Sequence, residues 1–159
     1  MRIIGIDPGL GITGYGVIEL KNARMNLIEA GIVKTPHTLP IHIRLKKIYQ
    51  ELQGLLEEFK PDLLALEDIY SHHMHPRTSI LMAHARGVVC LASCLSGVQI
   101  KGFSAKRIKK AVTGNGNASK EQVEKMVTSI LNLKKPITQP DAADALALAI
   151  GSVYIGKVG

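Results

Sequence analysis

The chain has 159 residues, of which 46% are hydrophobic and 21% charged, a composition typical of a globular protein with one core. This length excludes a large two-domain enzyme, and we expect a single domain over residues 1–159. The formal net charge is +7, and the two cysteines exclude a disulfide framework. Residues 1–7 are typical of a strand rather than of a charged and then apolar leader, so we expect a cytoplasmic protein.

The first sixty residues predict three strands and a helix. The apolar run 1–7 ends at Pro8-Gly9 and is typical of a buried strand. Residues 13–20 and 25–33 predict two further strands joined by a hairpin. Apolar residues recur at intervals of three and four over 41–59, which predicts an amphipathic helix.

The remaining chain predicts two more strands between helices. Residues 62–70 are nearly continuously apolar, as in an interior strand covered on both faces. Ser119 and Gln122 form a capping box at the start of one helix. The other elements are a helix from Pro76 to about Leu95, a strand over 98–103, a basic helix over 104–112 and a helix over 141–150. This order predicts an α/β fold, with a mixed five-stranded sheet that starts antiparallel, continues parallel and carries helices on both faces.

All of the excess positive charge lies in one segment. Residues 101–135 contain nine Lys or Arg and two Glu, while the rest of the chain is neutral. Such a concentration favours a surface that binds a polyanion such as nucleic acid. The alternative is a solvated helix face that lysines keep soluble.

Four carboxylates have apolar neighbours: Asp7, Glu67, Asp141 and Asp144. Each has a simpler explanation as a turn, strand-end or helix-dipole residue. If the strands that carry Asp7 and Glu67 are neighbours, however, both acids reach the same edge of the sheet, and the last helix can bring in the other two. Carboxylates so close repel one another unless a cation is bound, and their oxygens suit Mg²⁺, with Mn²⁺ as a substitute. Two such ions about 3.5–4 Å apart would support phosphodiester cleavage.

Five ordered motifs resemble those of one family. They are GIDPGLGITGYGVI (5–18), ALED (65–68), HARGV (84–88), TGNGNASKEQV (113–123) and PDAADALALAI (140–150). In this order they resemble the RuvC-type Holliday junction resolvases over nearly the whole chain. The resemblance implies a ribonuclease H-like fold, a homodimer, and paired nicks in a four-way DNA junction during recombination and repair. It also implies two Mg²⁺ per subunit on the four acids, which would be the catalytic residues, and a branch-migration helicase as a partner.

The resemblance also implies DNA-binding residues. Lys109 and Lys120 lie where the family has functionally important basic residues, and Tyr70 lies where it usually has a Phe that stacks on a base near the crossover. The further DNA-binding candidates are Arg107, Lys110, His72, His73 and Arg77. The segment after Glu67 departs from the family pattern and is one residue longer, which affects base preference more than metal chemistry.

Two other functions are compatible with these residues. A ribonuclease H-like nuclease that cuts RNA or another branched nucleic acid would have the same fold and acids. A non-catalytic junction-binding protein is the other alternative, against which the complete acid set argues. Residues 9–14 match G-x-G-x-x-G, but a strand pattern follows instead of a helix, so we exclude a dinucleotide site.

The long apolar helix raises three further expectations. Its stretch over 80–98 is interrupted by polar residues, including His84, which argues against a membrane span. The apolar surface of the helix makes it a candidate dimer interface, with a second core face as the alternative. We expect Cys90 and Cys94 to be buried packing thiols. We expect His84 to serve helix packing or an interface, with a metal-site role left open.

The loop histidines His72, His73 and His75 have no nearby cysteine or carboxylate partner. We therefore expect them to face DNA rather than to bind zinc.

Overall fold

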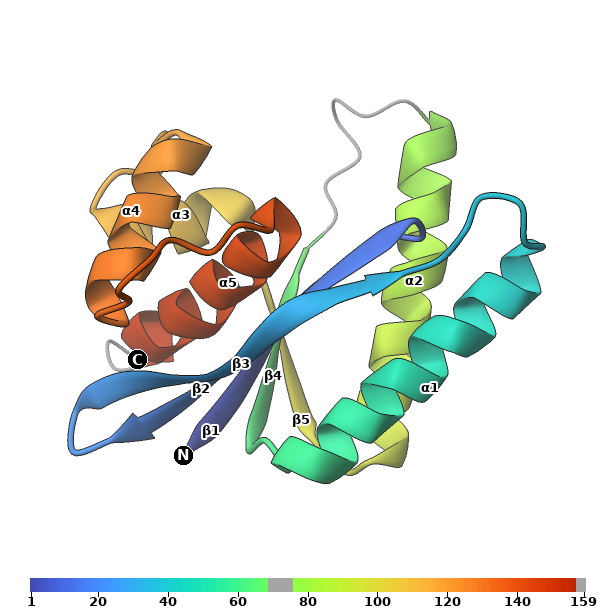
Figure 1. Cartoon of the computed structure of the whole chain (residues 1–159), viewed down its shortest axis with the longest axis horizontal. Coiled ribbons are helices and arrows are strands. Elements are labelled where there is room, and N and C mark those ends of the chain that lie inside the picture. Colours follow the sequence, from blue (N-terminus) through green and yellow to red (C-terminus); the bar gives the residue numbers. More distant parts are fainter. Residues whose placement is uncertain (69–75, 157–159) are drawn as a thin grey trace.

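Five strands form one mixed sheet at the centre of the structure, a computed structural model that describes residues 1–68 and 76–156 (Figure 1). The order across the sheet is β3-β2-β1-β4-β5. The strands β1 (Arg2–Asp7), β2 (Ile12–Lys21) and β3 (Arg24–Lys34) pair in antiparallel fashion. The strand β4 (Leu63–Glu67) runs parallel to β1, and β5 (Gln99–Phe103) runs parallel to β4. The predicted sheet is thus confirmed.

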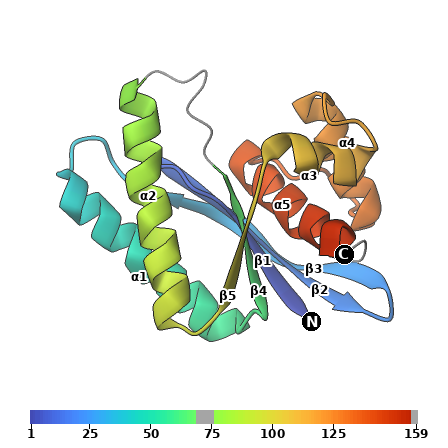
Figure 2. The same cartoon turned by 180° about the vertical axis from the view of Figure 1, so that it is seen from behind.

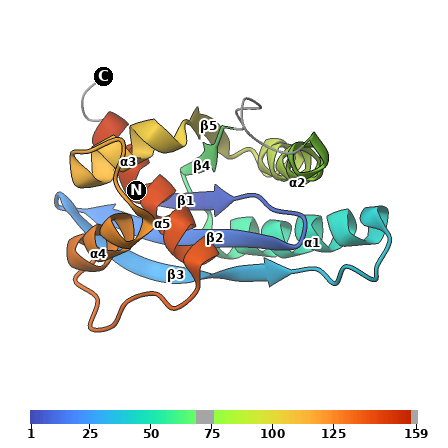
Figure 3. The ribbon, with the colours of Figure 1, turned by 90° about the horizontal axis from the view of Figure 1, so that it is seen from above.

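Helices cover both faces of this sheet. On one face lie α1 (Ile41–Phe59) and α2 (Pro76–Leu95), as Figures 1 and 2 show from opposite sides. On the other face α5 (Pro140–Gly156) packs directly against β1 and β2. The helices α3 (Ala105–Thr113) and α4 (Lys120–Ile130) pack on α5, as the view from above shows (Figure 3). The basic segment of the sequence therefore lies on the α5 side of the sheet.

The central strands supply side chains to two separate cores. Ile4 and Ile6 of β1 are fully buried on the side of α1 and α2, while Ile3 is buried on the side of α5. The strand β4 divides in the same way, because successive side chains of a strand point to opposite faces. This two-sided burial explains the nearly continuous apolar runs that predicted interior strands.

Most predicted boundaries are confirmed within a few residues, including α1 and the Ser119–Gln122 capping box. The helix α5 continues to Gly156, beyond the predicted end at residue 150. The strand β4 ends at Glu67, and residues 69–75 lie outside the described part of the chain.

The structure corrects one expectation about α2 and the reason given for another. Cys94 is exposed, whereas Cys90 is partly buried and packs against the core on the α1 and α2 side of the sheet. The polar residues within α2 also do not make the helix too polar to span a membrane. Residues Arg77–Leu95 reach a mean hydropathy of 1.5, and 22% of that window is buried. Core helices of soluble proteins pass the same test of length and composition, so it does not place the helix in a membrane.

Candidate active site

The candidate site is built at the carboxyl ends of two neighbouring parallel strands. Asp7 is the last residue of β1 and Glu67 the last of β4, and their predecessors Ile6 and Leu66 are partners in the parallel register. Alternate residues of each strand face α5, such as Ile3 in β1 and Ala65 in β4. Asp7 and Glu67 continue this alternation, so they lie on the α5 side. They line a pocket of about 310 Å³ together with Asp144 of α5. Three carboxylates that are far apart in the sequence are thus brought together.

Three glycines of the sheet allow α5 to bring its acids close. Gly5 pairs with Gly16, and Gly14 pairs with Asp7, so the three lie on the same face. A Cβ atom at Gly14 would overlap the backbone oxygen of Asp141, and one at Gly5 would overlap the backbone oxygen of Ala145. A Cβ atom at Gly16 would lie 2.6 Å from the side chain of Leu146. The helix backbone therefore rests directly on the sheet, beside Asp7.

Burial and mutual repulsion perturb the acids. The pKa of Asp7 is raised to about 7, first by burial and then by the charges of Glu67, Asp144 and Asp141, while Lys120 opposes the shift. Burial also raises the pKa of Glu67, with a smaller contribution from Asp144. Such a cluster favours bound protons or a bound cation over three or four bare carboxylates.

Lysines border the acid pocket. Lys109 of α3 and Lys120 of α4 both line it. The Nζ atom of Lys120 donates a hydrogen bond of 2.8 Å to Oδ2 of Asp144. This hydrogen bond is the main reason that the pKa of Lys120 is raised. The pocket thus combines carboxylates that can hold a cation with amino groups that can meet a phosphate.

Asp141 occupies a different position from the other three acids. It lies half-buried in the first turn of α5, and its charge reaches Asp7, but it does not line the pocket. Within residues 1–68 and 76–156, no three His, Cys, Asp or Glu side chains meet closely enough to hold a metal ion. The donor chemistry still fits a hard divalent cation, because every candidate ligand is a carboxylate. A bound cation would compete with Lys120 for Asp144.

The predicted DNA-binding residues lie in several places. Arg107 and Lys110 are exposed on α3, and Arg77 is exposed in the first turn of α2. His84 is exposed on α2, a helix that covers the opposite face of the sheet from α5 (Figure 2), and it does not line the acid pocket. The remaining predicted residues, Tyr70, His72 and His73, lie with His75 outside the described ranges.

Sequence reasoning missed an arginine that holds the end of β4. The Nη1 atom of Arg86 donates a 2.6 Å hydrogen bond to the backbone oxygen of Glu67, and Nη2 reaches Oδ1 of Asp68 at 3.2 Å. The backbone nitrogen of Asp68 in turn donates to the oxygen of Phe103. The signal was present as an arginine in the apolar middle of the helix, within the HARGV motif, but its partner could not be deduced from spacing.

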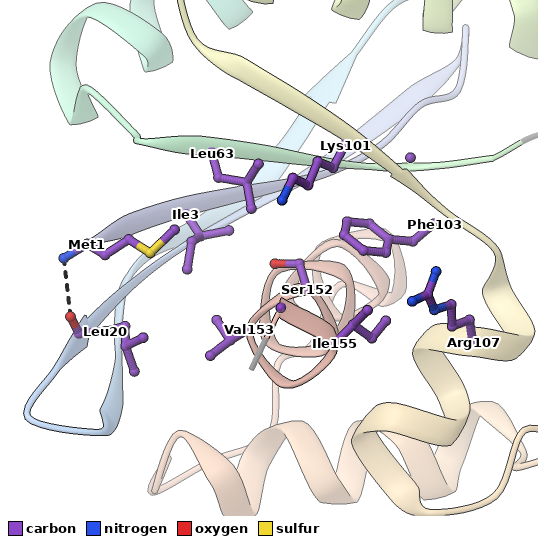
Figure 4. Close-up of a pocket in the computed structure, with 12 residues that line it drawn as sticks. Met1, Ile3, Leu20, Leu63, Lys101, Phe103, Arg107, Ser152, Val153 and Ile155 are labelled. Atoms are coloured by element: carbon purple, nitrogen blue, oxygen red, sulfur yellow. Dashed lines mark hydrogen bonds between the residues drawn. The ribbon is translucent and has the colours of Figure 1, made fainter. Parts of the chain in front are cut away.

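A larger cavity, of about 660 Å³, lies elsewhere on the α5 side of the sheet (Figure 4). Apolar side chains such as Ile3, Leu63 and Phe103 form much of its lining, and Lys101 and Arg107 lie at its border. Among residues 1–68 and 76–156, no carboxylate lines it. Its described lining therefore offers no carboxylate to hold a metal ion, and the smaller acid pocket is the candidate active site.

Comparisons with known proteins identify the family of the chain. The family model described as crossover junction endodeoxyribonuclease RuvC matches residues 3–152. The chain belongs to the RuvC family. A RuvC crossover junction endodeoxyribonuclease of Rhodopirellula baltica is 42% identical over 98% of this chain and 87% of its own length. One of Thermosipho melanesiensis is also 42% identical, over 94% of each chain.

Solved RuvC structures share the whole fold. The Thermus thermophilus RuvC structure superposes with a TM-score of 0.92 at 30% identity and covers 100% of this chain and 97% of the other. The T. thermophilus RuvC in complex with a Holliday junction substrate gives 0.91 at 28% identity, with the same coverage. The predicted ribonuclease H-like fold is confirmed.

Proposed function

We propose that this RuvC-family chain resolves four-way (Holliday) DNA junctions by paired nicks, with Asp7, Glu67, Asp141 and Asp144 as its catalytic, metal-binding acids. The observation that carries the proposal is the shared pocket of Asp7, Glu67 and Asp144, bordered by Lys109 and Lys120. Carboxylates beside amino groups match a phosphodiester substrate with a divalent cation, and the family is that of crossover junction endodeoxyribonucleases.

Nucleases of the RuvC family are metal-dependent, and we propose two Mg²⁺ ions per subunit, with Mn²⁺ as a substitute. When bound, these ions would supply an activated water and stabilise the leaving 3′ oxygen. Asp7 and Glu67 would hold them from the strand ends, and Asp144 and Asp141 from α5. A cation that binds must displace the Asp7 proton, because the pKa of Asp7 is raised to about 7 in the metal-free site. The Mg²⁺ concentration needed for half-maximal nicking should therefore fall as the pH rises through 7.

The lysines of the pocket would hold the substrate phosphate. Lys120 donates to Asp144 in the structure, so its amino group is already directed at the site of cleavage. Lys109 borders the same pocket from α3. We further propose that Arg107, Lys110 and Arg77 contact phosphates along the DNA arms. By resemblance to the family, we propose that Tyr70 stacks on a base near the crossover. From their own chemistry, we propose that His72 and His73 also face the DNA.

We also propose that two chains form a homodimer through α2. Its outer side exposes Ile80, Leu91 and Leu95, which are 58%, 53% and 65% accessible. A shallow hollow between Ile80 and Leu91 is lined by Ala83, His84, Gly87 and Val88. Such an apolar strip on a protein that acts on DNA favours a partner surface over solvent. A two-fold dimer would present two active sites to a substrate of nearly two-fold symmetry.

Three broader parts of the proposal rest on the family and on the general character of the chain. Residues 1–159 would form a single ribonuclease H-like nuclease domain. The protein would work in the cytoplasm and cooperate with a branch-migration helicase complex.

The substrate class can be tested by one comparison. A four-way junction, a linear duplex and an RNA–DNA hybrid of equal length are incubated with the protein, in Mg²⁺ and in EDTA. We expect symmetric nicks in the junction, only with Mg²⁺, and none from Asp7→Asn. Preferential cutting of the hybrid would instead favour the ribonuclease alternative. Junction binding without nicking by the wild type would favour a non-catalytic binding protein.

The role of the two lysines needs a binding measurement. Replacing Lys109 and Lys120 with Ala should reduce the slope of log affinity against log salt by up to about two phosphate equivalents. The double variant of two distant exposed lysines, Lys21 and Lys47, is the matched control. An unchanged slope for Lys109 and Lys120 would mean that they only keep the surface soluble.

A further inference from the structure

A buried arginine lies near the β1–β2 turn, on the opposite face of the sheet from the acids. Arg44, in the first turn of α1, is only 8% exposed. Within the described ranges, the ion pairs are Arg2–Glu19, Arg86–Asp68 and Lys120–Asp144, so none neutralises Arg44. Without a carboxylate partner, the largely buried Arg44 side chain is held by hydrogen bonding instead.

The hydrogen bond of Arg44 goes to Thr35, which follows β3. The Nε atom of Arg44 donates to Oγ1 of Thr35 at 3.0 Å. The hydroxyl of Thr35, itself 4% exposed, donates its only proton to the backbone oxygen of Leu10. The backbone nitrogen of Thr35 donates to the oxygen of Gly11 at 2.9 Å. Because Arg44 is always a donor, it forces the Thr35 hydroxyl to direct its proton at the turn.

A second threonine binds the same turn from within. The hydroxyl of Thr13 donates to the oxygen of Gly9 at 2.8 Å. Gly9, Leu10 and Gly11 therefore have their carbonyl groups held by two threonines. This turn begins directly after Asp7 and Pro8, and the proline ring restricts the backbone there. Asp7 is paired with Gly14 in the β1–β2 ladder, and the turn fixes the path of the chain directly after it.

We propose that Arg44 and Thr35 are positioning residues that hold Asp7 in its catalytic orientation through the β1–β2 turn. The inference rests on the proposed role of Asp7. Without the hydrogen bonds from Arg44 through Thr35, the turn could move and Asp7 could change direction. A small misplacement of a catalytic group lowers the rate strongly. None of the proposed DNA-binding residues is Arg44 or Thr35, so junction affinity should not change.

The test uses pairs of variants in the full-length chain. Thr35→Val removes the hydroxyl at nearly constant shape, and Thr35→Ser retains it. Arg44→Met is matched by Arg24→Met, because Arg24 is exposed in the β2–β3 hairpin. For each, the nicking rate at saturating junction is measured against Mg²⁺ concentration. Metal-free junction affinity is measured against salt.

We expect Thr35→Val and Arg44→Met to nick about ten times more slowly and to need more Mg²⁺ for half-maximal rate, with unchanged junction affinity. Thr35→Ser and Arg24→Met should nick within about twofold of the wild-type rate. If Arg44→Met does not fold, the Thr35 pair decides alone. Wild-type rates for Thr35→Val would overturn the inference. So would a weaker, less salt-dependent junction affinity of Arg44→Met at an unchanged rate, since Arg44 would then contact a phosphate.

Failure of the proposed function is distinguishable from failure of this inference. If the wild type and Asp7→Asn nick the junction equally, or neither nicks it, the proposed function fails. If the wild type nicks, Asp7→Asn does not and Thr35→Val equals the wild type, only the positioning role fails.

Discussion

Removing the charge of Asp7 should stabilise the metal-free protein at alkaline pH. The folded protein holds the Asp7 proton with a pKa of about 7, against an ordinary value of 3.8. The stability from this proton is complete below pH 3.8 and is lost as the pH rises through 7. At about 1.4 kcal/mol per pH unit, the ionised carboxylate costs the folded state about 4 kcal/mol above pH 7, and about 2 kcal/mol at pH 5. Asparagine is neutral throughout and avoids this cost.

Thermal unfolding in EDTA measures the difference directly. At pH 8.5, Asp7→Asn should melt at least about 8 °C above the wild type, at about 2–4 °C per kcal/mol for a chain of this size. At pH 5 this difference in melting temperature should fall to about half or less, because Asp7 of the folded wild type keeps its proton. The control is Glu58→Gln, which removes an exposed carboxylate and should leave the melting temperature unchanged at both pH values. Equal gaps at pH 5 and 8.5, or a less stable Asp7→Asn at pH 8.5, would refute the reasoning.

Three more substitutions test separate parts of the site. Gly14→Ala should displace the backbone of Asp141, destabilise the protein by about 1–3 kcal/mol in urea unfolding and reduce nicking at least about tenfold. The control is Gly54→Ala, where the added methyl group would meet no other atom and neither effect is expected. Arg86→Met should slow nicking by releasing the Glu67 backbone, without weakening metal-free junction affinity. Leu91→Glu should shift the protein from dimer to monomer in analytical ultracentrifugation; an unchanged mass would exclude this face of α2 as the interface.

Local sequence patterns predicted most of the elements. The alternation and the continuous apolar runs identified all five strands, and intervals of three and four identified α1. These patterns are readable because they reflect which side of a single element is buried. The candidate catalytic acids could be identified from the sequence for a related reason. A carboxylate that ends an apolar strand, such as Asp7 or Glu67, is conspicuous among its neighbours.

The glycines of the sheet show what such local patterns cannot predict. Gly9, Gly11 and Gly14 matched a nucleotide-binding pattern, which the following strand excluded, but no positive role followed from the sequence. The structure gives Gly14 a role together with Gly5 and Gly16, since the backbone of α5 packs against all three. The spacing of residues within the strand or within the helix does not reveal that Gly14 contacts the helix at Asp141.

The chain's residue order was thus enough to identify the elements, the basic segment and the acids worth considering. Folding decided how these acids interact: Asp144 enters the pocket, Asp141 stays beside it, and burial with mutual repulsion raises the pKa of Asp7. The supports from Arg86 and Arg44 also emerged only in three dimensions. The physical reason is that periodicity reports the environment of one element, whereas distances between side chains, and the burial that shifts their pKa values, arise only when separate elements pack together.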